Sequence, residues 1–270
     1  MRQWRLINDP HTTGARNMAV DEAILYAVGA GQHPPTLRVY GWAPPALSIG
    51  YGQRAREVDS EALREYGWDM VRRPTGGRAI LHIDELTYSI ALPADHPLAR
   101  GGVVESYQAI SRALLNMLDR LGGAARADRM ADDVPKSQTP VCFDTPSHYE
   151  ITVNGKKLIG SAQVRRAGGV LQHGSIPLTG DIARICDGLV YSDDAARESA
   201  RWQVRERALT LADALGRELT WQESAAALID AAADTFEVML VSNDLSQTEI
   251  SAADRLEQEI YTSDSWTLRR

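Results

Sequence analysis

The sequence contains few cysteines and none of the short cysteine motifs. Its 270 residues include two, Cys142 and Cys186, which lie far apart and outside any CxxC pair. This spacing argues against a disulfide scaffold and favours a reducing compartment. The N-terminal stretch MRQWRLINDP lacks the apolar core of a secretory signal, and no window approaches the roughly 18 apolar residues of a membrane span. We therefore expect a cytoplasmic protein that does not enter a membrane.

The chain also lacks an excess of basic residues and the common cofactor motifs. Its formal net charge is −7 and its pI is about 5.4, which argues against nucleic acid as the main partner. There is no GxxxxGK phosphate loop and no HExxH, and the six histidines do not follow metal-ligand spacing. A metal enzyme or a P-loop ATPase is not expected, and no cofactor is predicted.

No internal repeat or flexible linker interrupts the chain, so we expect a single domain over residues 1–270. The expected strands are short, and turn-forming residues such as Pro44 and Pro45 separate them. They cover residues 36–42, 46–52 and 68–74, a pair within 80–92, and then 148–153, 157–166 and 170–178.

Four helices are predicted from apolar spacing and capping residues. They cover residues 16–30, the stretch from Asp59 to near Gly67, residues 107–121, and the segment after Thr220, which forms a capping box with Glu223. The C-terminal third is expected to be helical throughout. This order favours an α+β fold with a mixed, largely antiparallel sheet flanked by helices on one side, rather than a doubly wound sheet.

The stretch RRPTGGRAILH (72–82) follows an expected strand and carries two adjacent glycines. Gly76 and Gly77 allow a sharp turn and the close approach of a ligand to the main chain. The arginines around them could hold an anion or a polar acyl-carrier arm: Arg72, Arg73 and Arg78. The alternative is a tight turn with solvated arginines. His82, at the end of the stretch, is either a base or a hydrogen-bonded residue of the sheet.

The stretch NGKKLIGSAQ (154–163) places two lysines at the start of a strand, after an Asn-Gly pair suited to a type I′ turn. Alternate strand residues face opposite sides, so Lys156 can stay in water while Lys157 points toward the covered face. A lysine held there can polarise a carbonyl or lower the pKa of a nearby thiol. The alternative is that both lysines simply solubilise a hairpin.

Cys142 lies in the polar loop VCFDTPS, where a core role explains it poorly. Cys186, in DIARICDGLV, lies among apolar residues and is the better candidate for a structural thiol. Thiolates attack thioesters readily, and a nearby cation raises the thiolate fraction. Cys142 is therefore the candidate nucleophile, against the alternative of a small apolar residue in a loop.

The order of these stretches resembles that of the lipoate-protein ligase and octanoyltransferase superfamily, whose fold is shared with biotin protein ligase. RRPTGGRAILH is similar to its arginine-rich Gly-Gly loop, GKKLIGSAQ to its lysine-bearing strand, and LQHGSIPL, which contains His173, to its His-Gly strand. YTSDSW is similar to its closing aromatic segment, so the resemblance extends from about residue 4 to residue 266. CFDTPSHYEI resembles the cysteine loop of the Gram-positive-type octanoyl-[acyl-carrier-protein]:protein transferase. A second transferase class places its cysteine near the position of Cys186, which is the second choice.

The resemblance implies a catalytic domain of the biotin/lipoate ligase type without a C-terminal accessory domain. It implies transfer of octanoyl from acyl carrier protein to Cys142, as a thioester, and then to a lysine of a lipoyl-domain acceptor such as the glycine-cleavage H protein, in lipoate biosynthesis and without ATP or metal. Lys157 would favour the thiolate and stabilise the oxyanion. The implied substrate-binding residues are Arg72, Arg73, Gly76, Gly77, His82, Gly160, Ser161, Ala162 and His173.

Carrier proteins of this kind are acidic, as this chain is overall, so docking requires a local basic face. We expect that face to comprise Arg72, Arg73, Arg78, Lys156, Arg165 and Arg166. Three alternative functions stay open: an ATP-dependent lipoate ligase, an amidotransferase moving octanoyl between carrier domains, and a non-catalytic lipoyl- or biotin-binding relative.

Overall fold

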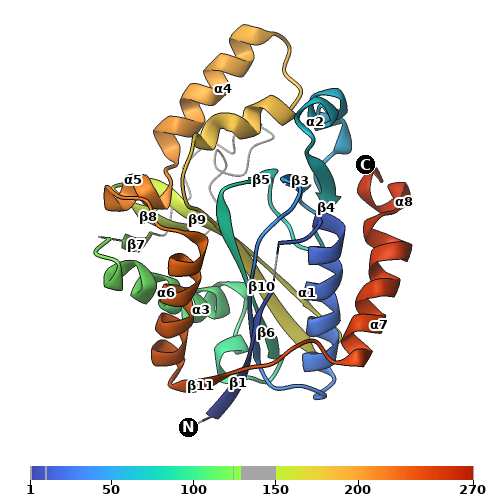
Figure 1. Cartoon of the computed structure of the whole chain (residues 1–270), viewed down its shortest axis with the longest axis vertical. Coiled ribbons are helices and arrows are strands. Elements are labelled where there is room, and N and C mark those ends of the chain that lie inside the picture. The colour runs from blue at the N-terminus through green and yellow to red at the C-terminus, as the bar shows by residue number, and fades with distance from the viewer. Residues whose placement is uncertain (1, 10, 124, 129–149, 270) are drawn as a thin grey trace.

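A computed structural model describes residues 2–9, 11–123, 125–128 and 150–269. Its strands are β1 (Arg2–Asn8), β2 (Thr36–Tyr40), β3 (Ala46–Ile49), β4 (Asp69–Arg72), β5 (Ile80–His82), β6 (Glu85–Pro93), β7 (Ala125–Asp128), β8 (Glu150–Val153), β9 (Lys156–Arg166), β10 (Gly169–Pro177) and β11 (Val238–Ser242). An eight-stranded sheet has the order β11-β1-β2-β6-β10-β9-β8-β7, and β4-β3-β5 form a second sheet (Figure 1). The pairs β11–β1 and β1–β2 are parallel and the other neighbours in the large sheet are antiparallel, which confirms the predicted fold class.

The α-helices are α1 (Gly14–Gly29), α2 (Ser60–Tyr66), α3 (Val103–Arg120), α4 (Asp194–Arg207), α5 (Leu211–Leu215), α6 (Trp221–Phe236), α7 (Gln247–Leu256) and α8 (Asp264–Thr267). Shorter turns of other helix types are η1 (Ala55–Glu57), η2 (Pro97–Ala99), η4 (Ile182–Gly188) and η5 (Glu257–Tyr261). The expectation that helices lie on one side of the sheet is wrong: α3 and α6 cover one face, and α1 and α7 cover the other (Figure 1).

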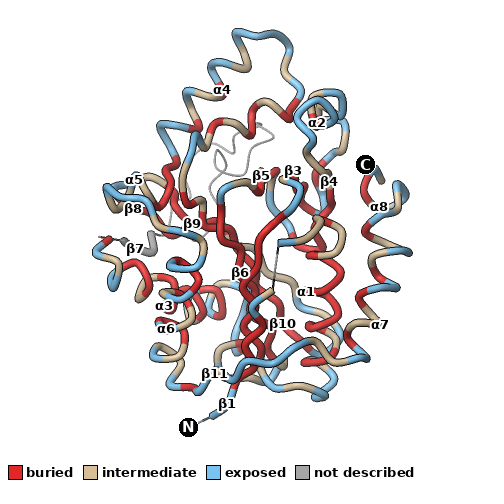
Figure 2. Tube along the Cα trace, viewed as in Figure 1, coloured by how far each residue is buried: buried red, intermediate tan, exposed pale blue. Residues whose placement is uncertain are grey.

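The two-sided cover follows from the central strands, which are apolar on both faces. In β10, Val170 joins the core under α3 and α6, and the next residue, Leu171, joins the core under α1 and α7. Successive side chains of a strand point to opposite faces, so a continuous apolar run needs cover on both. Figure 2 shows the buried residues concentrated along these strands and along the inner side of α1.

Local turn and capping predictions are confirmed. Asn154 and Gly155 have φ of 53° and 77°, and they join β8 to β9 in the expected hairpin. Asp59 caps the start of α2, and Gly67 ends it in the left-handed conformation. The Thr220–Glu223 capping box is present at the start of α6.

Two long-range pairings differ from expectation. The strands predicted within 80–92 exist, but they pair with different partners, because β5 joins β3 while β6 joins β2 and β10. The chain turns between them at Asp84, which has a φ of 49°. β11, in the third expected to be wholly helical, is an edge strand in which only Val238 is buried.

Among the described residues, no helix is long and apolar enough to cross a membrane.

Candidate active site

A cavity of about 450 Å³ lies over β9 and β10, between the loop that follows β4 and the N-terminal end of α3. Its lining is largely apolar, with contributions from Met18, Tyr40 and Trp42. It brings together most of the residues that the sequence indicated: Arg73, Gly76, Gly77, His82, Lys157, Gly160, Ser161, Ala162 and His173. Arg72 is not part of the lining, and Cys142 lies outside the described residues.

Lys157 is a buried cation in the wall of this cavity. Its side chain is 3% exposed, and Nζ lies 2.5 Å from Oε1 of Glu150, which is equally buried. The hairpin explains the meeting: a bulge between Ile151 and Thr152 shifts the register so that Thr152 is opposite Lys157. Strand alternation predicts that Lys157 points to the covered face, whereas no local pattern indicates Glu150 as its partner.

One glycine of the cavity lining has no room for a side chain. At Gly174, across the β9–β10 pair, a Cβ would lie 2.6 Å from Oγ of Ser161 and 2.6 Å from a ring carbon of Tyr88. A Cβ atom on Gly160 would lie 3.4 Å from Cε of Lys157, which is an ordinary van der Waals contact. The close packing of the strands at the cavity therefore depends on glycine at position 174.

His82 is buried and held at both ring nitrogens. Nδ1 lies 2.7 Å from Oε1 of Glu85, and Nε2 lies 2.6 Å from Oγ of Ser48. A carboxylate can only accept, so Nδ1 donates to Glu85 and Nε2 accepts from Ser48, whose oxygen also accepts from Arg73 at 2.6 Å. Burial lowers the pKa of His82, although the charge of Glu85 opposes the shift. Its ring stacks on Trp42 at 3.8 Å between centroids, so the pair forms a wall of the cavity.

His173 connects the cavity to a buried charge network. Nε2 lies 2.7 Å from Oγ1 of Thr75, and Nδ1 lies 3.3 Å from Oδ2 of Asp21 on α1. Asp21 also accepts from Nη1 of Arg38 at 2.8 Å and from the hydroxyl of Tyr40 at 2.9 Å. Burial acts to raise the pKa of Asp21, but the hydrogen bond from His173 and the charge of Arg38 outweigh it, and the net shift is downward. Asp21 was not predicted from the sequence, because a carboxylate in a helix gives no signal until its neighbours on the strands are known.

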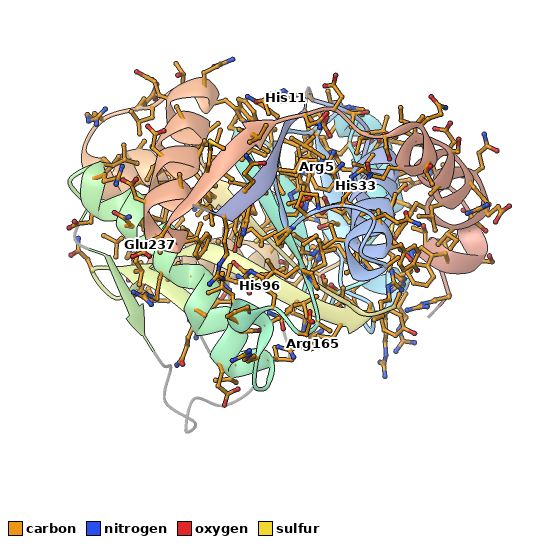
Figure 3. The ribbon with its side chains drawn as sticks, turned by 90° about the horizontal axis from the view of Figure 1, so that it is seen from below. Arg5, His11, His33, His96, Arg165 and Glu237 are labelled. Carbon is orange, nitrogen blue, oxygen red and sulfur yellow. The ribbon has the colours of Figure 1, made fainter. Side chains whose placement is uncertain are left out.

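Arg165 connects β9 to the N-terminal end of α3, where its side chain lies in Figure 3. Its guanidinium donates to the carbonyls of Gly101 and Gly102 at 3.0 and 2.9 Å, and to Oγ of Ser106 at 2.8 Å. These bonds place Val103 and Val104 at the rim of the cavity.

The predicted docking face is wrong for two of its six members. Arg72 and Arg73 are 0% and 3% exposed, because their guanidinium groups bind backbone carbonyls in the interior. Of the other members, Arg78 is partly exposed near Glu57, and Lys156 donates to the carbonyl of Arg205 at 2.8 Å. Arg166 pairs with the buried Glu22 at 2.5 Å.

Cys186 lies in η4 with 0% exposure, packed in a core that includes Leu47 and Leu189. Burial raises the pKa of its thiol, although a hydrogen bond with Tyr191 opposes the shift. This environment is that of a structural thiol.

Over the described parts of the chain, no group of three or more His, Cys, Asp or Glu side chains is arranged to hold a metal ion.

Comparison with known proteins places this geometry in a family. Residues 13–233 match the lipoyl protein ligase A/B catalytic domain. The chain is 42% identical over 275 residues to octanoyltransferase LipM of Kyrpidia tusciae, covering 100% of both chains. It is 36% identical over 273 residues to octanoyltransferase LipM of Bacillus subtilis, covering 99% of this chain and 98% of that one.

Solved structures share the fold. The bipartite lipoate protein ligase of Thermoplasma acidophilum has a TM-score of 0.81 at 24% identity, covering 99% of this chain and 97% of that one. A lipoate-protein ligase A bound with ATP has a TM-score of 0.80 at 25% identity, with 99% of each chain covered. The chain therefore belongs to the lipoyl protein ligase A/B catalytic domain family, and within it to the octanoyltransferases.

Proposed function

We propose that this octanoyltransferase takes octanoyl from acyl carrier protein onto Cys142 and passes it to a lysine of a lipoyl-domain acceptor, the glycine-cleavage H protein. In the first step the Cys142 thiolate attacks the carbonyl carbon of the octanoyl thioester. A new C–S bond forms, and the pantetheine sulfur leaves and takes up a proton. In the second step the acceptor lysine amine attacks the same carbon. The amide C–N bond forms, the amine loses a proton, and Cys142 leaves as the thiol.

The observation that carries this proposal is the position of Lys157 in the wall of an apolar cavity. Ligand pockets of roughly 300–1,000 Å³ hold small molecules, and a cavity of about 450 Å³ with an apolar lining suits a medium-length acyl chain. A buried ammonium at one wall can stabilise the oxyanion that develops on the thioester carbonyl in both steps.

Cys142 enters the proposal from the sequence, since it lies outside the described residues. It precedes Glu150, the partner of Lys157, by eight residues. A fully extended chain of that length spans at most roughly 28 Å. The buried, apolar setting of Cys186 supports the choice between the two thiols. The proposed acyl-binding residues are those of the lining, which does not include Arg72.

A transfer assay with defined donors tests the proposal. Octanoyl-loaded acyl carrier protein and apo H protein are mixed with the enzyme in the absence of ATP, and octanoylated H protein is measured by mass. The proposal predicts product, with turnover falling to background in Cys142→Ala. Product only after ATP, Mg²⁺ and lipoate are added would establish a lipoate ligase instead. Product only from octanoyl-H protein as donor, passed to a second lipoyl domain, would establish an amidotransferase.

A further inference from the structure

Arg72 is a buried hub that holds two distant segments together. Its side chain is 0% exposed, and its guanidinium donates to a set of backbone carbonyls. Nη1 donates to the loop after β3, at distances of 2.6–3.2 Å, and Nε and Nη2 donate to the C-terminal segment, at 2.8–3.2 Å. The accepting carbonyls belong to Gly50, Tyr51, Gln53, Trp266 and Thr267. A planar guanidinium with five N–H donors can bridge both segments, which a lysine ammonium cannot.

The C-terminal segment, residues 264–269, makes further contacts with Arg72 and with the loop after β3. Nε1 of Trp266 donates to the carbonyl of Arg72, at the end of β4, at 3.0 Å. The guanidinium of Arg269 lies over the rings of Tyr51 and Trp266, at 3.8 and 4.1 Å from their centroids, and donates to the carbonyl of Tyr51 at 2.9 Å. The segment and the loop are therefore joined by hydrogen bonds and by cation–π contacts.

The loop in turn supports the wall of the cavity. A Cβ atom on Gly50 would lie 1.9 Å from the carbonyl oxygen of Gly77, so the two backbones are in direct contact. The amide of Tyr51 donates to the carbonyl of Thr75 at 2.8 Å, and the hydroxyl of Thr75 binds His173. A shift of the loop would therefore move Gly77, which lines the cavity, and Thr75, which holds the lining residue His173.

We propose that Arg72 is a positioning residue through which the C-terminal segment holds the Gly76–Gly77 wall of the acyl cavity in place. The physical link is independent of the reaction, and only its effect on acyl binding rests on the proposed function. Arg72 is not among the described residues that line the cavity, and its link to the wall runs through Gly50 and Gly77.

Hydrogen–deuterium exchange on the full chain tests the link without any substrate. Trp266→Ala and Arg72→Lys are compared with wild type and with Trp202→Ala, a matched control whose indole on α4 is 63% exposed. We expect amides of residues 50–53 and 75–78 to exchange about tenfold faster in Trp266→Ala and Arg72→Lys than in wild type. The exchange rates of amides in β6 and β10 should be unchanged. Should Arg72→Lys fail to fold, Trp266→Ala decides.

Unchanged exchange at residues 75–78 would overturn the proposal, and so would an equal acceleration across β6 and β10, which indicates general destabilisation. Steady-state kinetics with an octanoyl donor then tests the consequence: KM rises several-fold while kcat changes less, because the wall contributes to ground-state binding. An unchanged KM in a variant with a loosened loop would overturn the role in substrate positioning. Absence of transfer by the wild type would contradict the proposed function instead, and the exchange result would still decide the link.

Discussion

Lys157 and Glu150 form an ion pair inside the protein, with 2.5 Å between Nζ and Oε1 and 3–4% exposure of both side chains. Buried ions of this kind depend on each other, because removing one leaves the other charged in an apolar site. The pair also brings the start of β8 to the cavity wall. Glu150, which follows the loop that contains Cys142, is thereby bonded to Lys157, which we propose to stabilise the oxyanion.

Substitution of this pair separates its structural role from its chemical role. Lys157→Met should destabilise the fold by about 3–5 kcal/mol, because it leaves the Glu150 carboxylate without its cation. Lys157→Met combined with Glu150→Gln should recover most of that stability, but transfer should stay about 10²–10³-fold below wild type because the oxyanion lacks its cation. Urea unfolding and the transfer assay measure the two effects, with Glu65→Gln on the exposed side of α2 as control. Recovery of transfer in the double variant would show that Lys157 serves only to neutralise Glu150.

Gly50→Ala should damage the cavity, although its own backbone conformation suits alanine. The new Cβ would lie 1.9 Å from the carbonyl oxygen of Gly77 and force that loop to move. We expect a loss of about 1–3 kcal/mol in the free energy of unfolding and weaker octanoyl transfer. Gly76→Ala is the matched control for stability, since a Cβ there meets nothing within 4 Å. Equal melting temperatures for the two variants would contradict the close packing of the loops.

His82 should make the protein less stable in mildly acidic solution. Its pKa is lowered by burial, against the opposing charge of Glu85, so the unfolded chain binds a proton that the folded chain resists. The contribution of His82 to stability is therefore fully present above the pKa of histidine in the unfolded chain, about 6.5. That contribution is lost as the pH falls from there toward the lowered pKa of the folded protein. Melting temperatures at about pH 7.5 and about pH 5.5 should differ more for wild type than for His82→Gln. Equal differences for the two proteins would rule out His82 as a source of the pH dependence.

Docking of the acidic carrier should depend on the basic residues that stay accessible. Arg78→Glu combined with Lys156→Glu should slow transfer from octanoyl-acyl carrier protein several-fold more than transfer from octanoyl-CoA, which has no protein surface to dock. The control reverses Arg217 and Arg255, two exposed arginines, with the same change in net charge. Equal slowing with both donors, or equal effects of the two pairs, would contradict a local docking face.

Predictions based on local sequence succeeded, whereas those that depend on distant partners did not. The Asn154-Gly155 turn and the cap at Asp59 are set by neighbouring residues, and both are confirmed. The edge strand β11 was missed because it pairs with β1 at the other end of the chain and buries little of its own surface. Its sequence therefore carries no strong alternation of apolar and polar residues.

The site shows the same division. From strand alternation and paired glycines, which are local signals, the sequence predicted a covered Lys157 and a Gly76–Gly77 loop open to a ligand, and these residues line the cavity. It did not identify Glu150, and it assigned Arg72 to the substrate, because the burial of an arginine and its carbonyl partners are properties of the folded chain. The roles of buried charges could be assigned only once their partners were known.

Intact mass spectrometry can detect the covalent octanoyl intermediate that the proposed transfer requires. Purified enzyme is mixed with octanoyl-acyl carrier protein, without ATP or acceptor, and its mass is recorded before and after hydroxylamine. We expect an octanoyl adduct that hydroxylamine removes, that persists in Cys186→Ser, and whose labile form is abolished in Cys142→Ser. Loss of the adduct only in Cys186→Ser, or no adduct in an enzyme that still lipoylates its acceptor when given ATP and lipoate, would contradict the proposed transfer.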